Sequence, residues 1–170
     1  MLKIYRDKDI FEVIDEFSAL FVKVFGKTPE IGEFLKFRIE DSIAAKRNAV
    51  VIVKLLDNKI IGGLFGFDFM SDSWYAGKVA PYIPKDIAWY DGKCFELNEL
   101  FVDEAHQRRG IGRELMKQAE GLGFERIILS TAENDNRKAV SFYENLGYQC
   151  LARGVKLGDD EDKLVLYKEL

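Results

Sequence analysis

Apolar residues recur along the chain in patterns that alternate between strand-like and helix-like spacing. The run from Leu2 to Tyr5 predicts a short strand, and apolar residues then recur every three to four positions from Ile10 to Val24. This second pattern predicts an amphipathic helix that opens with a capping box of Asp9 and Glu12 and ends at Gly26.

A second helix and a hairpin are predicted next. Thr28 stands in the capping position before Pro29, and the apolar residues that follow share one helical face. The segments 49–56 and 59–69 then predict two strands joined by a turn at Asp57 and Asn58. Glycines at 62, 63 and 66 indicate a bulge or the close approach of another backbone in the second strand.

The segment 70–92 has no clean period, and we interpret it as a long insertion or loop that could shape a pocket. Beyond it, strands and helices alternate. Strands are predicted at 94–102, 127–131, 148–157 and 163–167, and helices at 110–122 and 136–146. The last two strands, joined by a short acidic turn, should be antiparallel. This alternation predicts a layered α/β or α+β fold, and we expect residues 1–170 to form a single domain.

Composition narrows the class of protein. The 170 residues carry 25 basic and 29 acidic side chains without a block of one sign, which argues against a nucleic-acid partner. No apolar stretch approaches the roughly 20 residues that span a bilayer, and the first residues do not form a secretory or targeting signal. Cys94, Cys150 and His106 lack metal-binding spacing, so we expect no metal. We expect a cytoplasmic protein.

The residues around Gly110 and Gly112 carry the clearest chemical signal. They lie where an apolar strand passes through a polar turn into a helix, and a helix N-terminus binds anions through free amides and the helix dipole. Arg108, Arg109 and Arg113 add positive charge at the same point, which favours a pyrophosphate ligand. The alternative is a tight turn with solvated arginines. A dinucleotide fingerprint is excluded because Leu115 replaces its third glycine.

Two motifs in this half of the chain resemble the GNAT superfamily of N-acetyltransferases. QRRGIG at 107–112 matches its Q/R-x-x-G-x-G/A signature, and NDNRKAVSFYENLGY at 134–148 is similar to its other characteristic segment. The resemblance covers roughly residues 50–170. It implies a mixed, mostly antiparallel seven-stranded sheet with helices on both faces, splayed between strands 4 and 5, and acetyl-CoA as the co-substrate.

The resemblance also implies which residues hold acetyl-CoA. The strand end should bind the pantetheine arm, the loop amides should bind the pyrophosphate, and the helix that follows should contribute from the other side of the splay. The expected cofactor-binding residues are Leu100, Phe101, Val102, Gln107, Arg108, Arg109, Gly110, Ile111, Gly112, Arg113, Asn136, Ala139 and Tyr143.

Acetyl transfer to an amine needs a donor for the oxyanion and an acid for the departing thiolate. By resemblance, the backbone N–H of Val102 is the oxyanion donor and Tyr143 is the general acid. A phenol stays protonated at neutral pH and can give its proton to a developing thiolate. Tyr143 could instead be a packed aromatic residue on its helix.

Two glutamates are candidates for the general base. Glu96 lies eleven residues before Gln107, the spacing at which some protein-acetylating members of the superfamily carry a base, and Glu99 is the second candidate. On a regular strand their side chains point to opposite faces unless a bulge intervenes. Either could be a solvated strand-end carboxylate. Thr131 stands where members that acetylate protein N-termini have a glutamate.

Other residues have open interpretations. His106 could shuttle a proton, although a place on the loop surface is the simpler interpretation, and both cysteines look like small apolar strand residues. The insertion is rich in aromatic residues that could line an acceptor site or cover the sheet, and in aspartates that could meet a cation or face solvent. These residues are Trp74, Tyr75, Tyr82, Trp89, Tyr90, Asp68, Asp72, Asp86 and Asp91.

We therefore interpret the chain as an acetyl-CoA-dependent N-acetyltransferase that acts on a small primary amine. Polyamines, aminoglycosides, amino acids and peptides remain open, as does a longer acyl donor, because the acceptor pocket is the variable part of such folds. The alternatives are a non-catalytic acyl-CoA-binding module, a protein N-acetyltransferase and a purely structural domain. A homodimer is compatible with the edge that the final strands offer.

Overall fold

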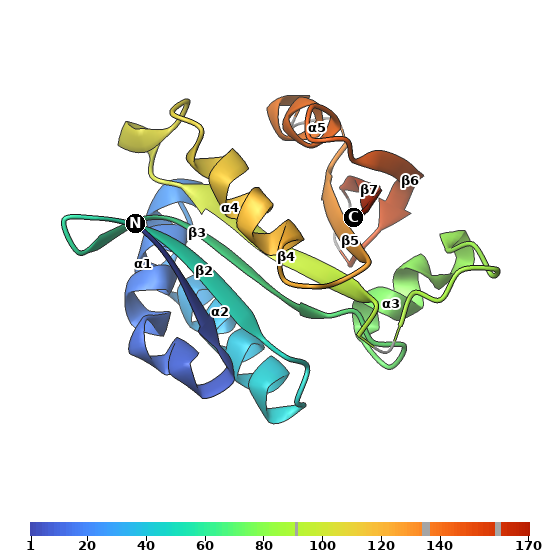
Figure 1. Ribbon diagram of the computed structural model, residues 1–170, viewed down its shortest axis with the longest axis horizontal. Coiled ribbons are helices and arrows are strands. Elements are labelled where there is room, and N and C mark those ends of the chain that lie inside the picture. The colour runs from blue at the N-terminus through green and yellow to red at the C-terminus, as the bar shows by residue number, and fades with distance from the viewer. Residues whose placement is uncertain (91, 134–136, 159–160) are drawn as a thin grey trace. The chain divides into compact units, whose positions relative to one another are not determined.

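The computed structural model describes residues 1–90, 92–133, 137–158 and 161–170. Seven strands form one sheet in the order β1-β2-β3-β4-β5-β7-β6, drawn in Figure 1. The chain divides into two compact units, Met1–Phe67 with Leu97–Leu122, and Asp68–Glu96 with Gly123–Leu170. The mixed seven-stranded sheet expected from the sequence is therefore confirmed. No helix within the described ranges is long and apolar enough to cross a bilayer.

The first unit contains the N-terminal strands, two neighbouring helices and the helix that follows the glycine-rich loop. Its elements are β1 (Leu2–Arg6), η1 (Asp7–Glu12), α1 (Ile14–Phe25), α2 (Pro29–Ala44), β2 (Val50–Leu56), β3 (Lys59–Asp68), the later part of β4 (Cys94–Val102), η3 (Glu104–His106) and α4 (Ile111–Glu120). β1 pairs with β2, and β2 with β3, in antiparallel ladders.

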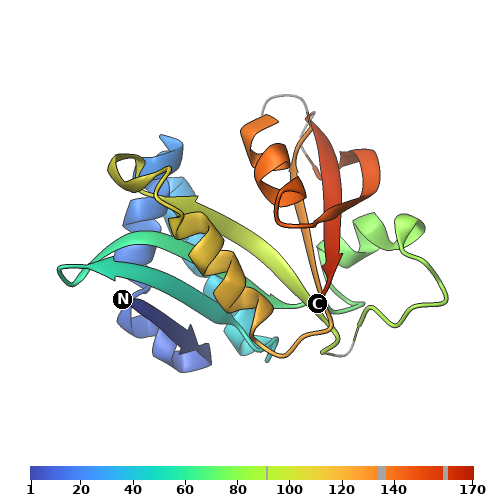
Figure 2. The same ribbon diagram turned by 45° about the horizontal axis from the view of Figure 1, so that its top comes forward.

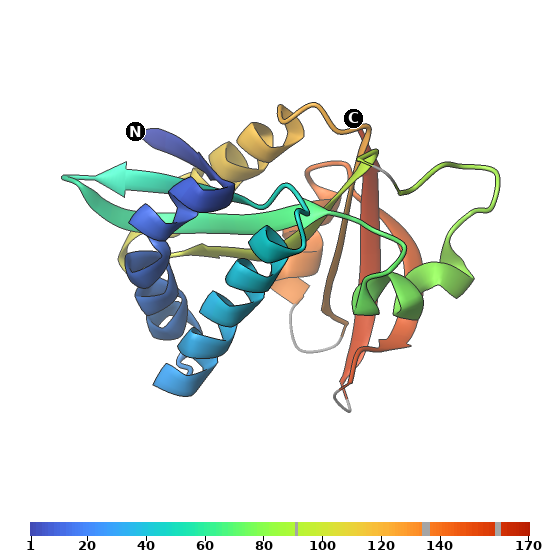
Figure 3. The same ribbon diagram turned by 90° about the horizontal axis from the view of Figure 1, so that it is seen from below.

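Helices cover both faces of the sheet in this unit. A Cβ added to Gly63 would meet the Phe17 ring of α1, whereas one added to Gly62 would meet Ile111 and Leu115 of α4. Since successive residues of a strand face opposite sides, α1 and α4 lie on opposite faces (Figures 2 and 3). Gly63 is needed because a Cβ there would lie 2.5 Å from the Phe17 ring, whereas a Cβ on Gly62 would be in tight contact with Ile111 at 3.1 Å and with the Phe101 carbonyl at 3.3 Å. The Phe101 carbonyl is a close backbone neighbour of the kind that the sequence indicated.

The start of the first helix differs from the prediction. Residues Asp7–Glu12 form a 3-10 helix, and α1 begins only at Ile14, with Val13 as its N-cap. The expected capping box of Asp9 and Glu12 is therefore wrong, because both residues lie inside the 3-10 helix. The end was correctly predicted: Gly26 has φ of 57° and terminates α1.

The second unit contains the insertion, the start of β4 and the C-terminal half of the chain. Its further elements are α3 (Trp74–Val79), η2 (Ala80–Tyr82), β5 (Arg126–Ala132), α5 (Arg137–Glu144), β6 (Gln149–Lys156) and β7 (Asp162–Glu169). The expected antiparallel pairing of the last two strands is confirmed. The insertion is not all loop, because Ser73 caps α3 by accepting a hydrogen bond from the Ala76 amide at 3.0 Å. At six residues, α3 is too short to give a visible period in the sequence.

The parallel pairing of β4 with β5 is short. It runs only from Cys94 opposite Arg126 to Glu96 opposite Ile128. Beyond that point β5 continues to pair with β7 as far as Ala132 opposite Lys163, while β4 continues to Val102. The two strands thus separate after three paired positions, which confirms the expected splay between strands 4 and 5.

β4 also contains a β-bulge. The Asp103 amide donates to the Ile61 carbonyl at 2.9 Å, and the Phe69 amide donates to the Cys94 carbonyl at 2.9 Å, as in an antiparallel ladder. From Ile61 to Phe69 the chain advances eight residues, whereas from Cys94 to Asp103 it advances nine. One extra residue in β4 reverses the alternation of side chains along it. Strand parity therefore does not place Glu96 and Glu99 on opposite faces.

Candidate functional site

The N-terminus of α4 offers backbone donors to a ligand. Gly110 is the N-cap with φ of 82°, and no side chain caps the helix. The amides of Ile111, Gly112 and Arg113 lie in the first turn, where a helix provides no backbone acceptor. A Cβ on Gly110 would meet no atom within 4 Å, so the glycine is needed for its positive φ and its approach to a ligand rather than for packing.

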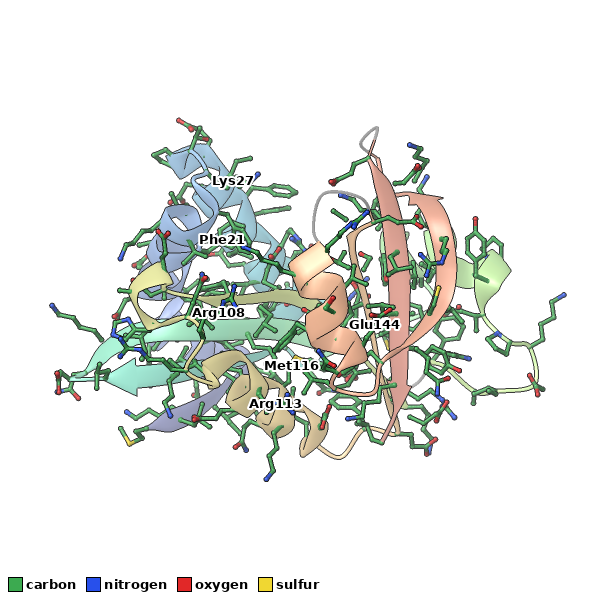
Figure 4. The ribbon with its side chains drawn as sticks, turned by 90° about the horizontal axis from the view of Figure 1, so that it is seen from above. Phe21, Lys27, Arg108, Arg113, Met116 and Glu144 are labelled. Atoms are coloured by element: carbon green, nitrogen blue, oxygen red, sulfur yellow. The ribbon has the colours of Figure 1, made fainter. Side chains whose placement is uncertain are left out.

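Three guanidinium groups surround this helix start. Arg108, Arg109 and Arg113 are exposed, and none of them pairs with a carboxylate in the described part of the chain. Figure 4 marks Arg108 on the loop before α4 and Arg113 on the helix. Positive side chains oppose the dipole at a helix N-terminus unless an anion is bound. The arrangement therefore fits a phosphate or pyrophosphate group.

The loop that carries these residues is fastened at both ends of η3. The Asp103 carboxylate accepts the Ala105 amide at 3.0 Å and pairs with Lys23 of α1 at 2.5 Å. The Gln107 side-chain amide donates to the Val102 carbonyl at 3.0 Å, so this side chain braces the loop. Arg108 adopts φ of 61°, a left-handed conformation that is uncommon for residues other than glycine.

Asp103 has a depressed pKa, chiefly because of its hydrogen bond with Lys23 and also because it accepts the Ala105 amide. A carboxyl whose pKa is lower in the folded state stabilises the protein above its unfolded pKa and loses that contribution as pH falls through the folded value. The ion pair with Lys23 is thus a fixed feature of the loop at neutral pH.

Replacing Asp103 by Asn should loosen the loop between β4 and α4. We expect the dissociation constant for coenzyme A to rise about three- to tenfold, since the uncharged side chain loses its bond with Lys23. The melting temperature should fall at pH 7. The gap from the original protein should begin to narrow below about pH 4 and should close as pH falls through the depressed pKa of folded Asp103, below which both proteins carry a neutral side chain. A gap that stays constant down to pH 3 would contradict this role, and calorimetry at each pH measures it.

The side chain of Phe101, near the end of β4, is packed in the core of the first unit. The Phe101 ring packs against Phe17, Phe21 and Phe25 with ring centroids 4.8, 5.8 and 6.3 Å away. Its side chain therefore belongs to the core between α1 and the sheet. Among the residues expected to bind the pantetheine arm, Phe101 thus has its ring committed to the core, and Val102 directly precedes the fastened loop.

Glu99 is held by α2. Arg38 donates from Nη1 to Glu99 Oε1 at 3.1 Å, and its Nη2 bonds the Asn98 side chain. The pKa of Glu99 is raised because burial outweighs the opposing charges of Arg38 and Lys27. Asn98 and Glu99 are consecutive, so on a regular strand they would point to opposite faces, yet both bond Arg38. The β-bulge of β4 therefore lies near these two residues. Glu99 is thus a fastened carboxylate rather than a freely accessible base.

Glu96 lies in the second unit and is buried, with 6% of its surface exposed. Its negative charge contributes to raising the pKa of Tyr75, for which burial is the larger cause. Burial likewise raises the pKa of the Cys94 thiol, and the Glu96 charge adds to that effect. The carboxylate therefore lies in a largely dry region beside a phenol and a thiol that both stay protonated at neutral pH.

Tyr143 lies near the end of α5 and is 8% exposed. Its ring packs against Phe142 and Tyr148 with centroids 5.2 and 5.6 Å away, and its carbonyl accepts the amides of Leu146 and Tyr148. The ring of Tyr143 is therefore packed, as one interpretation expected, and its role as general acid stays a prediction. Ala139 lies half-buried on the same helix. Asn136 lies outside the described residues.

The remaining candidates divide by exposure. His106 is half-buried with Nδ1 3.8 Å from Asp103 Oδ1, and Cys94 is buried as expected. Cys150 is a strand residue of β6, as expected, but its side chain is exposed. In the sheet order β6 is an end strand. Within the described ranges no cluster of His, Cys, Asp or Glu could hold a metal ion. Asp91 lies outside the described residues.

The aromatic residues of the insertion differ in how far their side chains are exposed. Tyr75 and Trp89 are buried in the core of the second unit, whereas Trp74 and Tyr82 are exposed. Tyr90 is half-buried and stacks on Phe69 with centroids 5.2 Å apart. Sequence reasoning did not assign roles to Lys23, Arg38 or Tyr75 individually. Their partners are more than 20 residues away along the chain, so no local pattern could have revealed them.

Comparisons with known proteins agree on one family. The model of the acetyltransferase (GNAT) family matches residues 12–148. No sequence among curated proteins matches the chain. Among solved structures, a protein of Desulfovibrio desulfuricans assigned to the GNAT family has a TM-score of 0.72 at 15% identity and covers 99% of both chains.

Two further solved structures are similar to the chain. Arabidopsis thaliana NAA60 in complex with acetyl-CoA has a TM-score of 0.68 at 16% identity, covering 100% of this chain and 99% of its own. Aminoglycoside 6'-acetyltransferase type Ii has a TM-score of 0.66 at 19% identity, covering 99% and 96%. At these identities the likeness establishes the fold and leaves the acceptor open.

Proposed function

Because the chain belongs to the acetyltransferase (GNAT) family, we propose that it transfers an acetyl group from acetyl-CoA directly to a primary amine of a small molecule. The observation that carries the proposal is the uncapped N-terminus of α4 with its three unpaired arginines among the described residues. A purely structural domain would have no reason to gather unpaired positive charge there.

The same residues fit the donor substrate. The amides of the α4 first turn and the guanidinium groups of Arg108, Arg109 and Arg113 would bind the pyrophosphate. Backbone groups of Leu100, Phe101 and Val102 would bind the pantetheine arm in the manner of an added strand. Bound acetyl-CoA would supply an activated acetyl thioester, so that no covalent intermediate with the protein is needed.

Three proton and charge roles fall to the protein. Glu96 removes a proton from the acceptor ammonium, because it is a buried carboxylate on β4 and a carboxylate can accept a proton from an ammonium. The Val102 amide stabilises the oxyanion, and Tyr143 protonates the departing thiolate. Glu99 serves mainly to hold Arg38 and α2 against β4.

The surroundings of Glu96 support a small acceptor. This carboxylate is buried, and its neighbours Cys94 and Ile128 share a core cluster with the insertion, which suits a compact amine better than a folded protein surface. Thr131 stands where some members of the family that acetylate protein N-termini have a glutamate, and this also favours a small acceptor over a protein N-terminus. A cytoplasmic location and a homodimer, both expected from the sequence, stay predictions.

A thiol-release assay with acetyl-CoA and a panel of amines tests the function. The panel contains polyamines, aminoglycosides, amino acids and short peptides with free N-termini. We expect release above the amine-free rate with at least one small amine, and acetyl-CoA should raise the melting temperature. Tight coenzyme A binding without release for any amine would instead favour a non-catalytic acyl-CoA-binding module, and release with peptides alone would favour a protein acetyltransferase.

A further inference from the structure

The insertion packs on the sheet face that presents Glu96. Cys94 and Ile128 belong to the same core cluster as Tyr75, Val79 and Trp89 of the insertion. Glu96 lies two residues after Cys94 and opposite Ile128 in the parallel ladder. Residues two apart on a strand, and residues paired across strands, share a face. Glu96 therefore faces the insertion, which Figure 3 shows in green alongside β6 and β7.

Other contacts in the second unit agree with this placement. The Arg126 guanidinium lies 5.6 Å from the Trp89 ring centroid and donates to the Ala88 carbonyl at 2.7 Å. Tyr167, paired with Ile128, lies 5.3 Å from Trp89 between ring centroids. Ser130, two residues after Ile128, lies on the same face of β5. The insertion thus covers a face that carries polar as well as apolar groups.

Two buried donors of the insertion make no well-formed hydrogen bond within the described residues, although the Ser130 hydroxyl lies near the Tyr75 phenol. The Tyr75 hydroxyl, on a side chain 9% exposed, makes no hydrogen bond of good geometry to any described residue, and neither does the indole N–H of Trp89, which is 1% exposed. An unsatisfied buried donor costs about 1–3 kcal/mol. Such donors are expected where a bound water or ligand completes the hydrogen bonds.

Tyr75 is the donor that lies within the field of Glu96. The pKa of its phenol is raised first by burial and then by the Glu96 charge, while the neighbouring Ser130 hydroxyl opposes both. The other titratable or charged groups on this face include Cys94 of β4, Arg126 of β5, Lys163, Tyr167 and Glu169 of β7, and Tyr90 of the insertion. Arg126 is held by Glu169 at 2.7 Å.

We propose that Tyr75 is a positioning residue of the acceptor site, whose hydroxyl holds the water that carries the acceptor's proton to Glu96. The water accepts a hydrogen bond from the Tyr75 hydroxyl and one from the acceptor ammonium, and it donates one to the Glu96 carboxylate. This arrangement uses both lone pairs and one hydrogen of the water, and gives it the two to four polar partners that a buried water needs.

The proton balance is simple. The ammonium gives one proton to the water as the water gives one to Glu96, and the resulting amine attacks the thioester carbonyl. The new C–N bond forms and the C–S bond breaks, and the thiolate receives a proton from Tyr143. The nitrogen, which carries one proton too many after its attack, releases that proton as the amide forms, and this proton restores the Tyr143 phenol. Tyr75 keeps its own proton throughout. The inference rests on the proposed function, and it makes the insertion one wall of the acceptor site.

A crystal structure tests the water directly and needs no activity. We expect an ordered water within hydrogen-bonding distance of Tyr75 Oη and a Glu96 carboxylate oxygen, and its loss in Tyr75→Phe. A phenol bonded directly to a protein group, or a side chain filling that space, would overturn the proposal. A protein without acetyltransferase activity that still holds this water would refute the proposed function and leave the water site standing.

Kinetics of Tyr75→Phe test the role of the water. With the best amine of the panel, kcat should fall about 10- to 100-fold at pH 7, with little change in the KM for acetyl-CoA. The deficit should shrink as pH rises toward the pKa of the acceptor, because a free amine needs no proton relay. Tyr75→Phe combined with Glu96→Gln should be little worse than Glu96→Gln alone.

Tyr82→Phe is the matched control, since it removes the same hydroxyl from an exposed position of the same insertion. It should behave like the original protein at every pH. If Tyr75→Phe lowers the rate equally at all pH values, or multiplies the deficit of Glu96→Gln, the residue has only a structural role and the proposal fails.

Discussion

Replacing Glu96 by Gln should lower kcat for the acceptor amine about 10²- to 10⁴-fold at pH 7, with coenzyme A affinity unchanged. The substitution keeps the size of the side chain and removes the group that accepts the acceptor's proton. Coenzyme A binding should persist because we expect its phosphate contacts at the α4 N-terminus. Steady-state thiol release measures kcat, and isothermal titration measures the affinity.

Two further variants make this result specific. Glu99→Gln is expected to lower kcat less than tenfold, since Arg38 holds the Glu99 carboxylate in its present position. Glu125→Gln is the control, because Glu125 forms a surface ion pair with Lys93 and both side chains are half exposed. Should Glu96→Gln retain kcat within a factor of two while Glu99→Gln loses it, the base is Glu99 and the assignment to Glu96 is wrong.

Reversing the charge of Arg109 and Arg113 together should weaken coenzyme A binding about 100-fold or more. Each arginine is expected to make a charge-assisted hydrogen bond to phosphate worth about 1.5–3 kcal/mol, and the introduced glutamates repel the anion. The dependence of the affinity on salt should also become weaker. Isothermal titration at low and moderate ionic strength measures both effects.

Lys3→Glu with Lys8→Glu is the matched control for the arginine variant. Both lysines are exposed, and the double change alters the net charge by the same amount at the opposite end of the first unit's sequence. We expect its affinity to stay within a factor of two. If both double variants weaken binding equally, the arginines act only through overall charge, and the α4 N-terminus is not the phosphate site.

Much of the fold was predictable because its signals are local. Helix spacing located α1, α2 and α4, and Gly26 and Gly110 terminate or open helices with the positive φ that only glycine adopts easily. The order of motifs predicted the seven-stranded sheet and the family, both of which are confirmed. The expected enzyme class, an acetyl-CoA-dependent acetyltransferase, agrees with that family.

The errors occurred where tertiary contacts decide local structure. Asp9 and Glu12 match a capping box, yet η1 occupies that segment and continues from β1, whose ladder with β2 ends at Arg6. α3 is too short to produce a period, and it is fixed by the packing of Tyr75 and Val79 on the sheet. The exposure of Cys150 was not predictable, because strand pattern alone does not identify the edge of a sheet.

The choice between Glu96 and Glu99 required the structure for a different reason. Alternation along β4 should have separated them, but the bulge between Cys94 and Asp103 removes that criterion. What distinguishes the two carboxylates is the identity of their neighbours, Arg38 for Glu99 and Tyr75 for Glu96. Both neighbours come from segments whose sequence does not reveal which strand they approach.

The left-handed backbone of Arg108 has a consequence for how this loop can evolve. At φ of 61° a residue with a Cβ is disfavoured by about 1 kcal/mol or more relative to glycine. Glycine at this position would relieve the backbone strain and stabilise the folded chain, but it would remove one of the three cations that we expect to bind the pyrophosphate. Arg108 therefore lowers stability in exchange for affinity. Selection of this protein for heat resistance should favour Arg108→Gly, and that variant should bind coenzyme A more weakly.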